Sequence, residues 1–323
     1  MAWRERLPIV LMYQQTIAAP VTFNGVGVHS GSPVCLTLQP ASADTGVLFR
    51  RRLDDGSVRE IAALSANTPR MDLSTVIGDP SGVHVATIEH LMAALYAMGI
   101  DNVVVGVDGA ETPIMDGCSA AFVSAIEEAG VVSQPVKRRY IRVLKTVSVE
   151  MNGARAEYRP HHTTRFEIAI DFDCATIGQQ TYAADLTAER FKRDLSRART
   201  FGFMKDVERL WANGYALGSS LANSVVIDVD GAIVNPDGLR YEDEFVRHKA
   251  LDAVGDQALA GSRILGCYAS YRGGHRLNAM ALSALLADRT AYEVVELPSR
   301  RVDPVRHAPL VAVAAPAYGP QML

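Results

Sequence analysis

The chain has 323 residues, of which 48% are hydrophobic and 21% charged, and its formal net charge is −4 at pH 7. This length allows two domains of about 150 residues with genuine cores, and the composition is that of a globular protein, which excludes global disorder. The weak negative charge gives no general reason to expect nucleic acid as a partner.

Cysteine spacing and hydropathy indicate the cellular compartment in which the protein is expected. The four cysteines are far apart and form no CxxC pair, which favours a reduced cytoplasmic protein and argues against a thiolate zinc site. We expect each to be a small buried apolar residue: Cys35, Cys118, Cys174 and Cys267. The apolar run IVLMY near the N-terminus is too short for a signal peptide, and no stretch approaches the ~18 apolar residues of a membrane span. We therefore expect a soluble cytoplasmic protein without stable membrane insertion.

The first half of the chain is predicted to run strands first and helices later. Residues 87–99, TIEHLMAALYAMG, keep helical spacing, with Thr87 as the expected N-cap and Gly99 as the stop. The other elements predicted in this half are strands at 34–40 and 102–109 and a helix at 119–130.

The second half repeats this order after SQPVKRRY (133–140), which loses periodicity and is the predicted linker. Its predicted elements are strands at 141–151, 154–160 and 166–172, helices at 186–198 and 245–261, a strand at 264–271 and a helix at 277–288. The pattern predicts an α+β protein of two similar two-layer domains, packed together with the active site in the cleft between them. The expected bounds are 1–135 and 139–301, with a poorly ordered tail at 302–323.

A possible metal site begins with His248 and Asp252, four residues apart on the predicted helix 245–261. This spacing puts both side chains on one helix face, and zinc accepts imidazole nitrogen together with carboxylate oxygen. A solvated helix face with a chance pair is the alternative. A third ligand would come from Glu89-His90, where His90 could bind the metal and Glu89 could accept a proton from water. The alternative there is a capping carboxylate beside a core-edge histidine.

His275 is a candidate proton donor because it follows two glycines in YRGGHRLN, where a loop side chain can face a cleft. Asp256, two turns along the helix from His248, could orient the imidazole of His275. An ordinary turn residue is the alternative. The remaining histidines lack such partners and are interpreted as structural: His29, His84, His161, His162 and His307.

Five longer segments occur in a fixed order: VATIEHLMAALYAMGIDN, ETPIMDGCSAAFV, SRARTFGF, GLRYEDEFVRHKALDAVGD and YRGGHRLN. Together they resemble the UDP-3-O-acyl-N-acetylglucosamine deacetylases, the zinc amidases of lipid A biosynthesis, from about Gln14 to Leu286. The resemblance implies hydrolysis of the N-acetyl group to give UDP-3-O-acyl-glucosamine and acetate, the committed step of lipid A biosynthesis, in a Gram-negative cell. It also implies a small-molecule substrate, and we expect a monomer.

The family's site residues can be carried over one at a time. The resemblance implies Zn²⁺, or Fe²⁺ in the cell, bound by His90, His248 and Asp252. Glu89 would be the general base, and His275 the cation that supports the oxyanion and protonates the amine. The remaining implied roles are Thr200 on the oxyanion, Asp256 behind His275, Lys249 on the diphosphate, Phe172 on uracil and Phe201 on the sugar.

The acyl chain would occupy a hydrophobic passage formed by an insert between Met204 and Val226. Ordinary helix core is the alternative for these side chains. Passage residues are expected to be Val207, Leu210, Trp211, Ala216 and Leu217, and further substrate contacts Leu73 and Arg272. The chain departs from the family at Ser219 and Ala222, where glycine and aspartate are expected, and at Cys174-Ala175 in place of His-Pro. These positions bear on acyl length and uridine contacts rather than on catalysis.

Two other functions are weighed against deacetylation of this substrate. A zinc amidase acting on another acylated nucleotide sugar is disfavoured because Lys249 and Phe172 are present. A non-catalytic sensor of the nucleotide sugar is disfavoured because the base and the three metal ligands are all retained.

Overall fold

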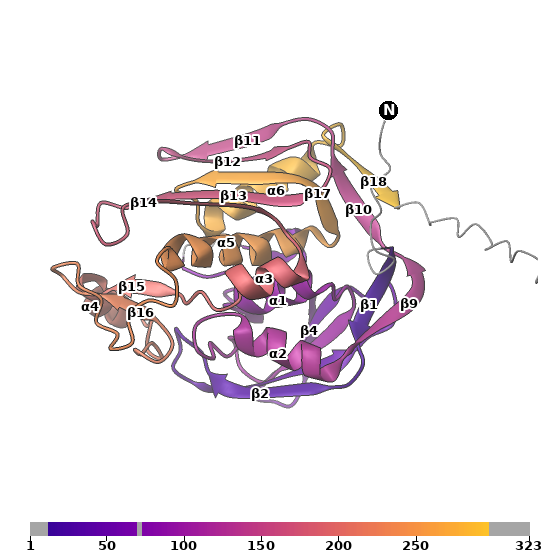
Figure 1. Ribbon diagram of the computed structural model, residues 1–323. Coiled ribbons are helices and arrows are strands. Elements are labelled where there is room, and N and C mark those ends of the chain that lie inside the picture. Colours follow the sequence, from indigo (N-terminus) through magenta and orange to yellow (C-terminus); the bar gives the residue numbers. More distant parts are fainter. Residues whose placement is uncertain (1–11, 70–72, 297–323) are drawn as a thin grey trace, which may run out of the picture.

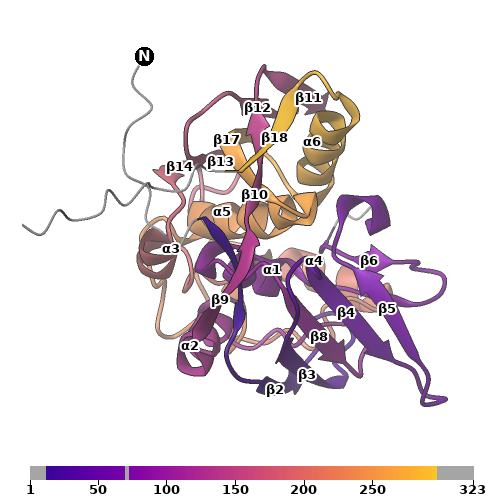
Figure 2. The same cartoon turned by 90° about the vertical axis from the view of Figure 1, so that its right-hand side faces the viewer.

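The computed structural model describes residues 12–69 and 73–296; the predicted tail at 302–323 lies outside them. Two large β-sheets form the outer layers, and helices α1, α2, α5 and α6 lie between them (Figures 1 and 2). The protein is therefore mixed α+β, as predicted. Within the described residues, none of the helices combines the length and the apolar character needed to cross a membrane.

The first half of the chain builds a five-stranded sheet in the order β2-β3-β8-β4-β5. Its strands are β2 (Val21–Val26), β3 (Pro33–Pro40), β8 (Val103–Val107), β4 (Val47–Arg52) and β5 (Val58–Ala62). β3 and β8 match the predicted strands, and Val34, Leu36 and Leu38 of β3 are buried in the core. The helices of this half are α1 (Glu89–Met98) and α2 (Ala120–Ala129).

The second half builds a seven-stranded sheet around β17 (Arg263–Tyr271), which pairs with β10, β12 and β13. The other strands are β10 (Arg139–Val143), β11 (Val147–Met151), β12 (Ala154–Arg159), β13 (Thr164–Asp171), β14 (Gln179–Asp185) and β18 (Tyr292–Glu296). The single strand predicted at 141–151 is thus two strands. α5 (Glu244–Gln257) and α6 (His275–Ala287) pack on this sheet.

Shorter elements complete the described chain. They are β1 (Tyr13–Ile17), β6 (Ile77–Gly78), β7 (His84–Val85), β9 (Val131–Lys137), β15 (Phe201–Phe203), β16 (Val225–Ile227), α3 (Ala188–Asp194) and α4 (Met204–Ala212), with 3-10 turns at Ser65–Asn67 and Ala258–Ala260. All four cysteines are free, but only Cys118 and Cys267 are buried, so the expectation of four buried cysteines is half right.

The predicted linker at 133–140 is extended and paired rather than irregular. β9 pairs antiparallel with β1, and β10 starts two residues after β9 ends. Between them, the buried side chain of Arg138 donates to Asp101 (Nη2 to Oδ2, 2.6 Å) and to the carbonyl of Gly99 (2.8 Å). Strand pairing gives hydrogen-bond partners to backbone N–H and C=O groups, which in an irregular loop would bind water instead. We propose that the domain division lies at this strand junction.

The start of α1 differs from the prediction. Thr87 has a φ of +58°, whereas an N-cap residue has an extended backbone, and Ile88 occupies the cap position without a side-chain cap. The expectation that Thr87 caps the helix is therefore wrong. Gly99, with a φ of 85°, ends α1 as predicted.

Close packing of α1 against α5 brings together candidate site residues from both halves of the chain. Gly255 of α5 makes this approach possible, because a Cβ atom there would lie 2.1 Å from the carbonyl oxygen of Glu89. The first turn of α1, with Glu89 and His90, therefore lies beside the C-terminal half of α5, which carries Asp252 and Gly255.

Candidate metal centre and active site

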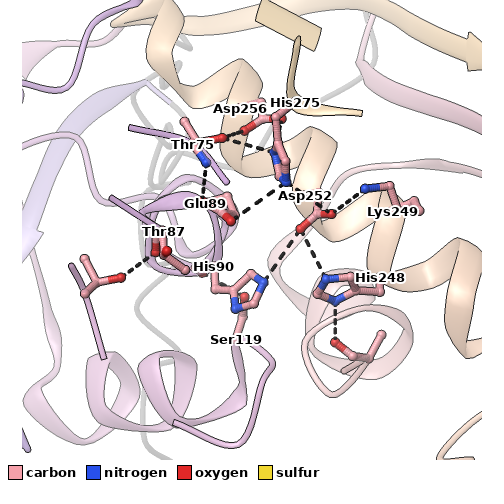
Figure 3. Close-up of polar contacts among 12 residues, drawn as sticks. Thr75, Thr87, Glu89, His90, Ser119, His248, Lys249, Asp252, Asp256 and His275 are labelled. Atoms are coloured by element: carbon pink, nitrogen blue, oxygen red, sulfur yellow. Dashed lines mark hydrogen bonds and ion pairs between the residues drawn. The ribbon is translucent and has the colours of Figure 1, made fainter. Parts of the chain in front are cut away.

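Three potential metal ligands converge where α1 meets α5 (Figure 3). Asp252 Oδ1 lies 3.4 Å from His248 Nε2 and 3.7 Å from His90 Nε2. One ligand atom from each of the three residues lies within 4.8 Å of the others, and all three residues are buried. The two histidines come together although more than a hundred residues separate them in the chain.

The donors fit a divalent cation. Asp252 Oδ1 is buried without a hydrogen-bond partner among the described residues, and such an oxygen needs a compensating positive charge. The carbonyl of Ala198 lies 3.0 Å from His248 Nδ1, which leaves Nε2 of that ring for a metal. Two imidazoles and one carboxylate are a ligand set that zinc and ferrous iron both accept.

The protonation states suit metal binding. Burial lowers the pKa of His90 to about 3, helped by the neighbouring His248, and burial also lowers the pKa of His248. Both rings are therefore neutral at pH 7 and offer a lone pair. Burial alone would raise the pKa of Asp252, but nearby positive charge, including that of Lys249, holds it below its usual range. Lys249 Nζ donates to Asp252 Oδ2 at 2.9 Å.

Glu89 and His275 face each other beside the three ligands. His275 Nε2 lies 3.8 Å from Glu89 Oε1, and His275 Nδ1 lies 3.0 Å from Asp256 Oδ2. Burial raises the pKa of Glu89 to about 7. Burial would lower the pKa of His275, but the carboxylates of Asp256 and Glu89 raise it to about 9. A carboxyl group that titrates near neutrality therefore faces a cationic imidazole.

His275 does not lie in a loop, as the sequence suggested, but is the first residue of α6, directly after Gly274. The glycine has an extended backbone at the N-cap, so the side chain is fixed by the start of a helix.

Thr75 joins these groups and was not predicted from the sequence. Its backbone N–H donates to Glu89 Oε2 (2.9 Å), and its hydroxyl donates to Asp256 Oδ1 and lies 3.1 Å from His275 Nδ1. Figure 3 shows Thr75 between the Glu89 side and the His275–Asp256 side. The surrounding sequence, LSTVIG, has no motif that would mark a threonine as functional.

The candidate ligands open into a cavity of about 500 Å³. Expected substrate residues that line it are Leu73, Phe172, Thr200, Phe201, Val207, Leu210, Trp211, Ala216 and Lys249. Leu217 is not among the lining residues and is 53% exposed. His29, interpreted as structural, does line the cavity, and its Nδ1 has no partner among the described residues.

A second hollow of about 420 Å³ adjoins the cavity at Phe172, which lines both. Arg272 and Lys205 lie in this second hollow, together with Cys174 from one of the two departures from the family pattern. Ser219, from the other departure, lines the first cavity. Cys174 and Ser219 thus lie on the walls of the two hollows, and neither is one of the three candidate ligands.

Comparisons with known proteins point to a single family. The sequence model described as UDP-3-O-acyl N-acetylglycosamine deacetylase matches residues 14–287. Proteins from Brucella ovis, Brucella canis and Brucella melitensis, each named UDP-3-O-acyl-N-acetylglucosamine deacetylase, are 55% identical over 287 residues. The matches cover 88% of this chain and 99% of each relative. The chain belongs to the UDP-3-O-acyl N-acetylglycosamine deacetylase family.

Proposed function

We propose that this protein hydrolyses the N-acetyl group of UDP-3-O-acyl-N-acetylglucosamine to give UDP-3-O-acyl-glucosamine and acetate, the committed step of lipid A biosynthesis. One observation carries the proposal. Three buried metal-ligating side chains converge beside a carboxyl and an imidazole on a large cavity, in a chain of this family.

His90, His248 and Asp252 would hold the metal ion, for which we propose Zn²⁺, with Fe²⁺ as an alternative in the cell. When bound, such an ion acts as a Lewis acid and lowers the pKa of water toward ~7. A neutral amide is a poor electrophile, so its hydrolysis needs this help.

The protein's own groups then move the protons. Glu89 accepts a proton from the attacking water, and its pKa of about 7 suits a general base near neutral pH. His275, whose pKa is about 9, supports the negative charge on the carbonyl oxygen and donates a proton to the departing amine. The Thr200 hydroxyl, on the cavity wall, assists at the same oxygen. Asp256 holds His275 in position through Nδ1.

The remaining contacts follow the chemistry of the substrate. Val207 and Ala216 give apolar wall for the acyl chain, whose burial is worth about 0.8 kcal/mol per CH₂. Lys249 in the cavity and Arg272 in the second hollow provide cations for the diphosphate. Phe172, between the two hollows, stacks on uracil. Phe201 touches the sugar, and Leu73 on the cavity wall is a further substrate contact.

We propose a cytoplasmic location in a Gram-negative cell and a monomeric state. The four free cysteines are consistent with a reducing compartment. Sedimentation equilibrium at micromolar concentration would reveal a dimer if the monomer proposal were wrong.

A turnover assay with two substrates tests the proposed activity. We expect the purified metal-loaded protein to release acetate from UDP-3-O-acyl-N-acetylglucosamine much faster than from the same sugar without its acyl group. The reason is that binding energy from the acyl chain is available to orient the amide. An equal or higher rate on the non-acylated sugar would contradict the proposal.

A further inference from the structure

The buried carboxylate of Glu111 lies outside the catalytic groups but accepts four hydrogen bonds from their surroundings. Oε1 accepts from the backbone N–H of His29 (2.9 Å) and the hydroxyl of Thr87 (2.8 Å). Oε2 accepts from the backbone N–H of Ser30 (3.0 Å) and from its hydroxyl (2.9 Å). Each carboxylate oxygen therefore accepts from two donors. A glutamine amide has only one oxygen, and its NH₂ group would face two of these donors.

On one side, Glu111 holds the backbone that starts α1. Thr87 is a β-branched residue with a φ of +58°, a conformation that persists only when its surroundings impose it. Its hydroxyl is bound by Glu111, and its carbonyl accepts from the Thr112 hydroxyl. Thr87 lies two residues before Glu89, and Figure 3 shows it beside the Glu89-His90 turn. The carboxylate thus fixes the chain direction from which Glu89 and His90 project.

On the other side, Glu111 holds the turn at residues 27–31. Gly27 lets the carboxylate approach, since a Cβ there would lie 2.1 Å from Glu111 Oε2. Carbonyls of the same turn accept hydrogen bonds from the segment that follows α4: Leu217 N–H donates to His29 and Gly218 N–H donates to Val28, both at 3.0 Å.

The segment held by this turn forms part of the apolar wall. Ala216, next to Leu217, lines the cavity in a left-handed backbone conformation with a φ of +57°. Ser219 and Ser220, directly after Gly218, line it as well. One carboxylate is therefore linked by hydrogen bonds to the wall of the cavity and to the helix that carries the base.

We propose that Glu111 is a positioning residue that couples the acyl-binding wall of the cavity to the Glu89-His90 turn. This inference rests on the proposed function. In the presence of the Glu111 carboxylate, the turn at 27–31 keeps the wall packed against a long acyl chain. Thr87 at the same time keeps the Glu89 side chain in its catalytic position. Without it, a long acyl chain loses its wall, whereas an acetyl group at the same sugar oxygen loses little, because it is too short to reach that wall.

The test compares Glu111→Gln with a matched control, Asp101→Asn. Asp101 also accepts several hydrogen bonds, from Gln15 N–H (2.7 Å) and Arg138, but lies beyond the opposite end of α1. Deacetylation would be measured with a long-chain 3-O-acyl substrate and with the 3-O-acetyl compound, together with metal content and melting temperature.

For Glu111→Gln we expect kcat to fall for both substrates and KM to rise for the long-chain substrate alone. The long-chain to acetyl ratio of kcat/KM would then fall about tenfold or more, the loss expected for a charge-assisted hydrogen bond. Metal content should stay at the wild-type value. Asp101→Asn should lower the melting temperature and leave the ratio unchanged.

An unchanged ratio in Glu111→Gln, with lower stability in both variants, would overturn the coupling and leave Glu111 a structural residue only. If Glu111→Gln does not fold, Ser30→Ala removes one of the four donors at an exposed position and should lower the ratio about two- to threefold. An unchanged ratio there also overturns the coupling. A wild-type protein that hydrolyses neither substrate would instead refute the proposed function.

Discussion

Asp252 lies close to most of the ionisable groups of the site. Its Oδ1 faces His90 and His248, while its Oδ2 accepts from Lys249 and lies 3.9 Å from His275. Because the side chain is buried, removing one neighbour leaves charge that water cannot compensate. We therefore expect two classes of substitution around Asp252. Those at a metal ligand should lose the metal, and those at the proton-transfer groups should lose activity with the metal still bound.

Glu89 and His248 provide that separation. We expect Glu89→Ala to lower kcat by about 10²- to 10⁴-fold, the usual contribution of a general base, with the metal still bound. His248→Ala should lose both activity and metal, because it removes one of three ligands. Acetate release and the metal-to-protein ratio would be measured on both variants. Near wild-type activity in Glu89→Ala would refute the proposed mechanism.

The sequence suggested the candidate ligands but not the residues that hold them. His90, His248 and Asp252 could be proposed because their spacing and the matching segments point to a known chemistry. Thr75 and Glu111 could not, since a threonine or glutamate that acts through hydrogen bonds has no characteristic spacing. Their roles depend on contacts across 14 to 200 residues of chain, which exist only in the folded protein.

Among the elements, α5 contributes most to the site, and its first residue anchors it. Glu244 is fully buried and accepts from the guanidinium of Arg199 (Nε to Oε1, 2.9 Å; Nη2 to Oε2, 3.0 Å) and from its backbone N–H. Arg199 lies between Ala198, whose carbonyl faces His248, and Thr200 on the cavity wall. This buried ion pair therefore ties α5 to the segment that orients a metal ligand.

Acid should weaken this anchor in a predictable direction. Burial would raise the pKa of Glu244, but its hydrogen bonds from Arg199 hold it below the usual value. A carboxylate with a lowered folded pKa stabilises the fold above its unfolded pKa of about 4.5, and that stabilisation is lost as pH falls through the folded pKa. At pH 7, Glu244→Gln should cost about 3–5 kcal/mol, because it leaves Arg199 buried without its counter-charge.

The measurement is urea unfolding of wild-type protein and Glu244→Gln from pH 7 to pH 3, both with a chelator so that metal release does not contribute. The difference in unfolding free energy should be largest at neutral pH and shrink below about pH 4.5. A difference that stays constant with pH would show that the carboxylate charge is not the stabilising feature.

Element prediction succeeded where local pattern dominates and failed where long-range pairing does. The helix at 87–99 and the strands at 34–40 and 102–109 follow from periodicity and match α1, β3 and β8. The segment 133–140 has no such pattern, yet it is extended because β1, over a hundred residues earlier, pairs with it. Thr87 was expected to cap α1 from its residue type, but the buried Glu111 holds it in a left-handed conformation instead.

At the scale of the whole molecule, the candidate metal site joins the two halves. His90 belongs to α1 of the first half, whereas His248 and Asp252 belong to α5 of the second. An active site between two α+β units could be proposed from the sequence because the matched segments lie in both of its halves. The close approach of α1 to α5 depends on Gly255. The need for a glycine at this position is apparent only from the packed structure.

Because unfolding of either half would separate the ligands, metal binding should stabilise the entire fold. At a free metal concentration 100 times the dissociation constant, linkage predicts about 2.7 kcal/mol of added stability, or a rise of a few degrees in melting temperature. Wild-type protein and His248→Ala would be melted with a chelator and with added Zn²⁺. The wild-type protein should gain stability with Zn²⁺, and His248→Ala should gain little. An equal gain in both would mean that the stabilising metal binds elsewhere than between α1 and α5.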